Sequence, residues 1–223
     1  MSLEALVFDA YGTLYDPHSV AKRCEQLWPG KGERISQLWR TKQLEYSWLR
    51  SLMRRYLPFS AVTRDALGYA CDAAGASLSA KEEQTLLEEY RRLAPYPDVL
   101  PALGAMRDYR KAILSNGSPD MLLPLVESSG LAAHFDAVLS VDELKFFKPA
   151  PEVYRLAVER FGVEAKAIGF VSSNGWDAAG AKSFGFKVFW INRTGAPVDA
   201  LGFPPDHVIR SLGDLPGVLA RET

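Results

Sequence analysis

Short runs of consecutive apolar residues recur along the chain and are bounded by polar residues or glycine. A strand buried on both faces lacks the alternation of a half-exposed strand, so these runs predict central strands of a covered parallel sheet. They lie at Ala5–Phe8, Ala112–Leu114, Ala137–Leu139, Ala167–Val171 and Val188–Ile191.

Stretches with apolar residues at three- and four-residue spacing separate the later runs and predict helices. They cover Met121–Ser129, Pro151–Phe161 and Trp176–Phe184. Strands that alternate with helices are typical of α/β proteins, so we expect a doubly wound parallel sheet.

The segment from residue 17 to residue 92 interrupts this alternation. It contains no strand-like run, and its apolar positions follow helical spacing. Pro29-Gly30, Pro58 and Gly75 divide it into about four helices. We therefore expect an α/β core domain formed by residues 1–16 and 93–223. A helical cap domain, residues 17–92, is inserted after the first strand and lies over the carboxyl edge of the sheet.

Composition and charge narrow the class of protein. The 223 residues are 48% hydrophobic and 24% charged, which excludes a disordered or fibrous chain. Lys and Arg number 26 against 27 Asp and Glu, so no net field favours nucleic acid or an anionic membrane. The apolar runs are too short to cross a bilayer, and no signal peptide is recognisable. Cys24 and Cys71 are too few for a disulfide framework, so we expect reduced thiols and a cytoplasmic protein.

Polar side chains follow the apolar runs, at the edge of the sheet where ligands of α/β proteins bind. Asp9 ends the first run, Ser115 and Asn116 end the second, and residues 172–177 follow the fourth. Lys148-Pro149 precedes the helix that begins at Pro151. We expect one aspartate, one hydroxyl–amide pair, one lysine and one Ser/Asn/Asp cluster to meet at this edge.

Four ordered motifs at these positions resemble those of the haloacid dehalogenase superfamily. They are Phe8–Leu14, Leu114–Gly117, Lys148-Pro149 and Ser172–Asp177. The tract Trp39–Arg50 is similar to the cap helix of the L-2-haloacid dehalogenases within that superfamily. The resemblance covers essentially the whole chain. It implies a hydrolase that converts short-chain L-2-haloalkanoic acids to D-2-hydroxyalkanoic acids through an ester on Asp9, with no metal or other cofactor.

The residues themselves separate displacement at carbon from phosphoryl transfer. Phosphatases of the superfamily carry a second Asp two residues after the nucleophile, and Tyr11 stands there in this chain. Asp177 is the one acidic residue of the fourth motif, whereas Mg²⁺-dependent phosphoryl transfer uses an acid-rich motif. Displacement at carbon needs a bare carboxylate, which Asp9 supplies, and a neighbouring Lys148 would keep it ionised.

The departing halide develops negative charge, so we expect hydrogen-bond donors and positively charged side chains to face it. Arg40 of the cap and Asn116 of the core are the candidates, and the electropositive ring edge of Trp176 completes the cradle. These roles match the halide site that the resemblance implies.

The resemblance also implies roles for the remaining site residues. Asp177 positions or activates the water that cleaves the ester, with Ser172, Asn174 and Lys148 around it. Ser115 and the backbone N–H groups near Ala10 and Tyr11 hold the substrate carboxylate, and Thr13 fixes the rotamer of Asp9. The side chains of Tyr11, Leu44, Phe59 and Trp176 wall the pocket and exclude water.

Plainer interpretations stay open for several of these residues. Asp9 is also a common residue in turns after strands, Arg40 would be solvated on an exposed helix, and Leu44 and Phe59 fit a plain core. For the whole chain, the alternative functions are a metal-dependent phosphatase and a non-enzymatic scaffold that binds a partner through the cap.

An apolar stripe on the cap has more apolar residues than the core of one short helix needs, so we expect that it also forms a homodimer interface. The stripe consists of Trp39, Trp48, Leu52 and Met53. The sequence leaves the preferred chain length and halogen open.

Overall fold

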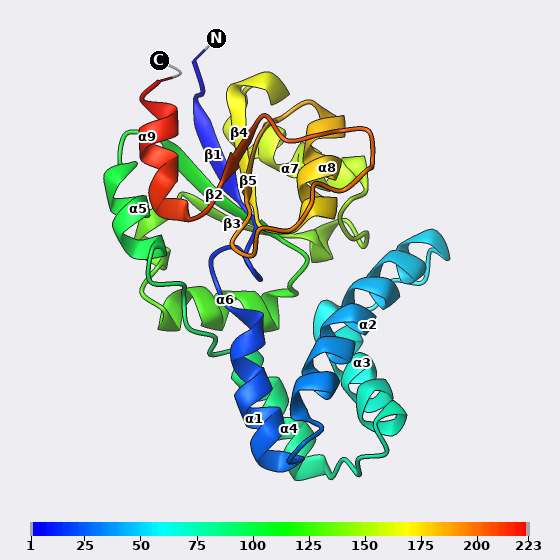
Figure 1. Ribbon diagram of the computed structural model, residues 1–223. Helices are drawn as coiled ribbons and strands as arrows, with labels where there is room; N and C mark the ends of the chain where they lie inside the picture. The colour runs from blue at the N-terminus through cyan, green and yellow to red at the C-terminus, as the bar shows by residue number, and fades with distance from the viewer. Residues whose placement is uncertain (1, 222–223) are drawn as a thin grey trace.

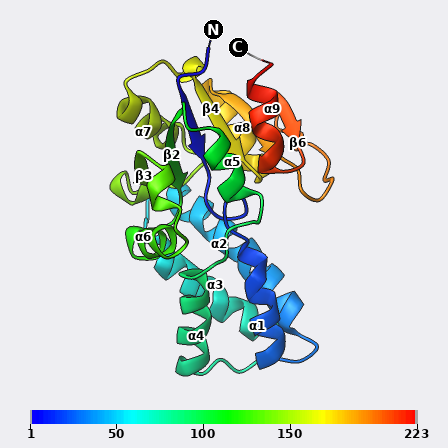
Figure 2. The ribbon, with the colours of Figure 1, turned by 90° about the vertical axis from the view of Figure 1, so that its left-hand side faces the viewer.

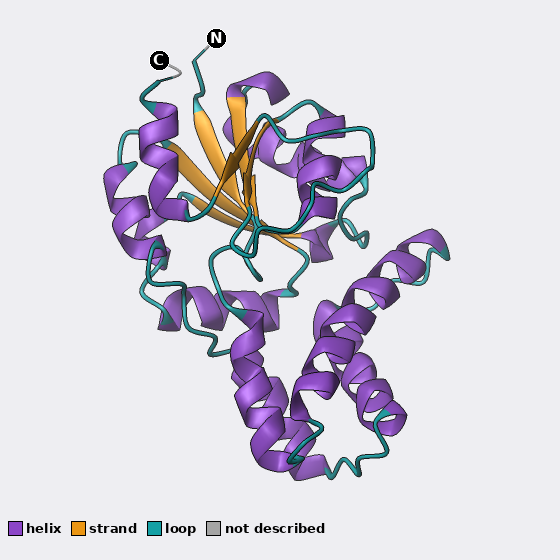
Figure 3. Cartoon of the chain, in the orientation of Figure 1, coloured by secondary structure: helices purple, strands orange, loops and turns teal. Residues whose placement is uncertain are grey.

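A six-stranded, all-parallel β-sheet forms the centre of the protein (Figure 3). The computed structural model describes residues 2–221, and the strand order is β3-β2-β1-β4-β5-β6. The strands are β1 (Ala5–Phe8), β2 (Arg110–Ser115), β3 (Ala137–Ser140), β4 (Ile168–Ser172), β5 (Lys187–Ile191) and β6 (His207–Ile209). The doubly wound parallel sheet expected from the sequence is confirmed.

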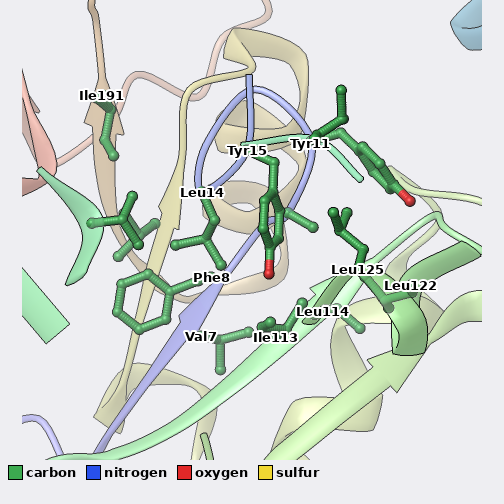
Figure 4. Packing of buried hydrophobic residues seen from close by; sticks show 14 of the residues in the cluster. Val7, Phe8, Tyr11, Leu14, Tyr15, Ile113, Leu114, Leu122, Leu125 and Ile191 are labelled. Carbon is green, nitrogen blue, oxygen red and sulfur yellow. The ribbon is translucent and has the colours of Figure 1, made fainter. Parts of the chain in front are cut away.

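Helices cover both faces of this sheet. Figure 1 shows α7 (Pro151–Phe161) and α8 (Gly175–Phe184) on one face, with α5 (Val99–Ala105) and α9 (Leu215–Leu219) on the other. All four residues of β1 are therefore fully buried, as their uninterrupted apolar run predicts. Figure 4 shows this packing, with Val7 and Phe8 beside Ile113 and Leu114 of β2.

The segment between β1 and α5 is helical, and it lies at the end of the sheet away from the two termini (Figure 1 and Figure 2). Its helices are α1 (Val20–Leu27), α2 (Gly32–Leu52), α3 (Phe59–Ala73) and α4 (Ala80–Tyr90). The expected division into about four helices is confirmed. None of the helices in residues 2–221 combines the length and apolar composition needed to cross a lipid bilayer.

Two details differ from the sequence pattern. The sixth strand, β6, was not predicted, because three residues at an edge with Val208 exposed carry no clear periodicity. The apolar stripe that the sequence predicts between residues 39 and 53 splits into two environments along α2. Trp39 is fully buried and its indole N–H donates to the Thr63 carbonyl, whereas Leu52 is 80% exposed.

Candidate active site

The parallel register brings the ends of three neighbouring strands together. Phe8 is aligned with Ile113 of β2 and with Val171 of β4, so Asp9 emerges between the two strands. The Asp9 backbone N–H donates to the Val171 carbonyl at 2.9 Å, which extends the ladder by one bond. The carboxyl ends of β1, β2 and β4 thus present their polar residues to one place, next to the helical segment.

Asp9 is buried, and its carboxylate accepts hydrogen bonds from three side chains. Lys148 Nζ donates to Oδ1 at 3.1 Å, while Thr13 Oγ1 and Asn174 Nδ2 each donate to Oδ2 at 2.9 Å. Thr13 is fixed in turn, since its Oγ1 accepts from the Ser173 backbone N–H at 2.8 Å. These contacts hold the carboxylate in one orientation.

Lys148 is fully buried and lies between two carboxylates. Its Nζ is 3.1 Å from Asp9 and 2.9 Å from Asp177. Burial alone would lower the pKa of the Lys148 ammonium, but the two carboxylates outweigh it and the pKa is raised. Lys148 is therefore a permanent cation, and its backbone N–H donates to Asn116 Oδ1 at 2.9 Å.

Asp177 is also fully buried, at the start of α8. Its Oδ2 accepts from Lys148 at 2.9 Å and from Ser172 Oγ at 3.1 Å, and its Oδ1 accepts from Tyr154 Oη at 2.8 Å. Burial raises the pKa of Asp177 to about 6, against the lowering effect of Lys148. An aspartate with this pKa can accept a proton near neutral pH and return it.

Arg40 reaches the site from α2, on the opposite side from the strands. Its Nη2 lies 3.5 Å from Asn174 Oδ1, while Asn174 Nδ2 donates to both Asp9 and the Tyr11 carbonyl. The guanidinium thus faces the site. One asparagine links the cationic group of the helical segment to the carboxylate of the sheet.

A small cavity lies between the sheet edge and the helical segment. Every residue of its lining is one that the sequence predicts for the site: Asp9, Tyr11, Arg40, Leu44, Phe59, Ser115, Asn116, Asn174 and Trp176. The other predicted residues lie behind this lining: Ala10, Thr13, Lys148, Ser172 and Asp177. Of these, Thr13 and Lys148 bond to Asp9 directly, and Ala10 accepts backbone bonds from the turn that follows it.

Tyr11 brings a phenol to the cavity where the motif of phosphatases has an acid. Its hydroxyl is buried and has no hydrogen-bond partner within residues 2–221. Burial raises the pKa of Tyr11 well above its usual range, so the hydroxyl stays protonated and is a donor. Gly117 makes room for the ring, because a Cβ at that position would lie 2.9 Å from Tyr11 Cε2.

The electrostatics of the site differ from those of a metal centre. Within the described chain, no cluster of three or more His, Cys, Asp or Glu side chains has the arrangement of a metal site. The ammonium group of Lys148 stands between the carboxylates of Asp9 and Asp177, 3.1 and 2.9 Å from them. The positive charge between the two carboxylates is thus supplied by a side chain of the protein.

Sequence reasoning missed two members of the site. Tyr154, on α7, donates to Asp177, but in the sequence it sits in a helix whose apolar stripe points to core packing. Ser173 acts through its backbone N–H on Thr13, and a backbone donor leaves no signal in residue type. The neighbouring Ser172 and Asn174 were found because their own side chains match the motif.

Comparison with known proteins agrees with this geometry. Residues 3–185 match the family of haloacid dehalogenase-like hydrolases. An (S)-2-haloacid dehalogenase of Pseudomonas sp. (strain YL) is 48% identical over 212 residues, which cover 94% of this chain and 91% of that protein.

Solved structures of such enzymes have the same fold over their full length. The crystal structure of the L-2-haloacid dehalogenase RSc1362 is 48% identical, covers 99% of this chain and 100% of its own, and superposes with a TM-score of 0.97. A structure of the L-2-haloacid dehalogenase from Xanthobacter autotrophicus holds covalently bound chloropropionic acid. It is 43% identical, with the same coverage and a TM-score of 0.92.

Proposed function

Because the chain belongs to the haloacid dehalogenase-like hydrolases, and among them to the (S)-2-haloacid dehalogenases, we propose that it hydrolyses short-chain L-2-haloalkanoic acids to D-2-hydroxyalkanoic acids. The observation that carries this proposal is the Asp9 carboxylate. It lines a small cavity together with Arg40 and is held by three side-chain donors. The chloropropionic acid bound covalently in the Xanthobacter enzyme supports an ester on this aspartate.

In the first step, an Asp9 carboxylate oxygen forms a bond to C2 of the substrate. The C2–halogen bond breaks, and the halide leaves with the bonding electron pair. Attack from the side opposite the halogen inverts C2, so an L substrate gives a D product. Arg40, Asn116 and the ring edge of Trp176 share the cavity with Asp9 and stabilise the departing halide, where charge develops.

The substrate carboxylate binds at the end of β2, where Ser115 lines the cavity. The Ser115 oxygen accepts from the Gly117 N–H at 3.0 Å, so its hydroxyl hydrogen donates to the substrate. The backbone N–H groups of Ala10 and Tyr11 complete this carboxylate site. The alkyl part lies against the apolar side chains of Leu44 and Phe59, which also exclude bulk water.

In the second step, water attacks Cγ of the Asp9 ester and gives a proton to Asp177. The bond between Cγ and the ester oxygen then breaks, and that oxygen leaves with the substrate carbon as the product hydroxyl, taking the proton back from Asp177. Lys148 and Ser172 orient Asp177 for this transfer, and Asn174 holds Asp9. The water oxygen stays on Asp9, and the second water proton is released to solvent as the Asp9 carboxylate forms again.

A single turnover in ¹⁸O-labelled water, with enzyme in excess over (S)-2-chloropropionate, tests the ester route. The product oxygen comes from Asp9, so we expect unlabelled D-lactate, with the label on the enzyme. Labelled lactate in the first turnover would show direct attack of water on C2 and would overturn the proposal.

Asp9→Asn is the matched variant for this experiment. The amide has nearly the shape of the carboxylate but is a poor nucleophile, so chloride release should stop while the fold is kept. Chloride release at the wild-type rate would remove Asp9 from the mechanism. Full activity after dialysis against a chelator is the result expected for an enzyme whose central cation is Lys148.

We also propose that residues 17–92 form a cap domain on a core of residues 1–16 and 93–223. The helices of this segment pack on one another, α2 against both α1 and α3, which supports a separate unit. The buried, unpaired thiols of Cys24 and Cys71 support a reducing compartment and hence the cytoplasm.

The exposed end of α2 supports a homodimer through the cap. Leu49, Leu52 and Met53 present apolar surface there, whereas Trp39 is buried and unavailable to a second copy. Light scattering should give the mass of a dimer for the wild type and that of a monomer for Leu52→Glu. A wild-type monomer at micromolar concentration would contradict this assignment.

A further inference from the structure

The active-site cavity has a polar and an apolar side. Asp9, Arg40, Ser115 and the two asparagines supply charged and hydrogen-bonding groups, while Leu44, Phe59 and Trp176 are apolar or aromatic. We propose that Trp48, which lies behind the cavity lining, sets the length of the alkyl chain that the site accepts. This inference rests on the proposed function and concerns the substrate range of the same cavity.

Helix geometry places Trp48 next to the apolar side. Arg40, Leu44 and Trp48 are spaced four residues apart on α2, so they share one face of the helix. The first two line the cavity, and Trp48 is one turn farther along the same face. Its ring meets that of Trp176 edge to face, with the centroids 5.4 Å apart and the planes at 76°. Trp48 thus supports the Trp176 wall from the cap side.

Packing, not hydrogen bonding, explains the position of the Trp48 ring. Its indole N–H is buried and has no partner in the described part of the chain. Trp39 and Trp28 differ, since each donates its indole N–H to a backbone carbonyl, at 2.7 and 3.0 Å. An unpaired buried donor is unfavourable, so the ring of Trp48 is held there by its contact with the aromatic wall.

Trp48 also lies on the way from the cavity lining to the exposed end of α2. It is half-buried, and Leu52, one turn beyond it on α2, is 80% exposed. A longer alkyl chain that passes Leu44 therefore meets the Trp48–Trp176 pair and stops there. With a smaller residue at position 48, Trp176 can move toward the vacated space and the cavity can open at its apolar end.

The test is the ratio of kcat/KM for (S)-2-chlorohexanoate to that for (S)-2-chloropropionate, measured by chloride release. In Trp48→Ala we expect the ratio to rise by about tenfold or more, because even one methylene changes discrimination in an apolar pocket by about 10-fold to 200-fold. Trp48→Phe, which keeps an aromatic ring, should raise the ratio less. The ratio distinguishes a role in specificity from general damage, which lowers both values together.

Trp28→Phe is the control, because Trp28 is a buried tryptophan of the cap outside the cavity lining. Its ratio should equal that of the wild type. An unchanged ratio in both Trp48 variants, with chloropropionate still turned over, would overturn the inference and leave the proposed function intact. A wild type that releases chloride from neither substrate would overturn the proposed function instead. If Trp48→Ala does not fold, the ratio for Trp48→Phe decides.

Discussion

The ammonium group of Lys148 lies 2.9 Å from Asp177 Oδ2 and at the same time 3.1 Å from Asp9 Oδ1. One cation is thus shared between Asp9, the proposed nucleophile, and Asp177, the proposed acceptor of a proton from water. With both aspartates ionised the group carries one net negative charge, and it is almost completely enclosed. The protonation of each carboxylate therefore depends on the charge of the other, so a change in either residue affects both chemical steps.

Replacing Lys148 by methionine should damage both activity and stability. Two buried carboxylates would then lack a cation, and removal of one member of a buried ion pair costs about 3–5 kcal/mol. We expect urea unfolding at neutral pH to show a loss of this size. Lys166→Met, which removes an exposed partner of Glu164, should change stability by less than about 1 kcal/mol. Equal losses in the two variants would contradict the central role of Lys148.

Asp177→Asn should trap the ester. The first step needs Asp9 and no base, whereas the second needs a proton acceptor, whose loss slows such steps by about 10²-fold to 10⁴-fold. Mass spectrometry of the variant mixed with (S)-2-chloropropionate should show the enzyme carrying one added propionate group on the peptide that contains Asp9. A burst of one chloride per active site should accompany it. Slow chloride release with no modified enzyme would assign Asp177 to the first step instead.

The pH dependence of the second step follows from burial of Asp177. Burial raises the pKa of this carboxyl to about 6 in the free protein, and the negative charge of Asp9 contributes to the rise. That charge is absent from the ester, so the basic form of Asp177 is lost there as the pH falls below 6. Ester hydrolysis should be nearly constant above pH 7 and should fall by about tenfold per pH unit well below 6. Rapid-quench measurement of ester decay between pH 4.5 and 8 would show this directly. Decay that becomes faster at low pH would contradict a basic role for Asp177.

Tyr154→Phe should move this inflection to higher pH. The Tyr154 hydroxyl donates to Asp177 at 2.8 Å and so favours the ionised carboxylate. A hydrogen bond to a charged group contributes about 1.5 kcal/mol, so its loss should raise the pKa by about one unit. Tyr69→Phe, on an exposed face of the cap, is the control and should leave the profile unchanged. A lower rate with the same inflection would mean that Tyr154 has only a packing role.

The parts of the site that the sequence predicts share a physical cause. Asp9, Ser115 and Ser172 lie at the carboxyl ends of strands that are buried there, and parallel pairing with fixed register aligns those ends. Apolar runs alone are enough to locate such positions. The residue types at those positions then indicate the chemistry.

The pattern of apolar and polar residues did not predict contacts between separate helices. Tyr154 meets Asp177 only because α7 packs against α8, and the spacing within α7 says nothing of that neighbour. The contact of Trp48 with Trp176 likewise depends on how α2 lies relative to the sheet. The short edge strand β6 was missed for a different reason, since its three residues contain too little pattern to detect.

A further contact that the sequence pattern does not predict, between Tyr56 and Asp142, joins the helical segment to the stretch of chain that leads to Lys148. Tyr56 Oη donates to Asp142 Oδ1 at 2.7 Å, and its ring stacks on Phe147 at 4.8 Å, next to Lys148 in the chain. Phe147 in turn packs against Phe59 of the cavity wall, with the ring centroids 5.9 Å apart. The Tyr56 side chain therefore connects the position of the cap to two parts of the site.

Tyr56→Phe removes this hydrogen bond and keeps the ring. The loss should lower the free energy of unfolding by about 1 kcal/mol, because Asp142 still pairs with Lys145 at 2.7 Å. A cap that is held less firmly should bind substrate more weakly, so we expect KM to rise several-fold and kcat to change less. Asp142→Ala removes the same bond together with the Lys145 ion pair, so adding Tyr56→Phe to Asp142→Ala should cause no further loss, because the bond that the two residues share is already gone. Additive effects in the double variant, or a fall in kcat with KM unchanged, would show that Tyr56 and Asp142 act separately and not as a contact that closes the cap.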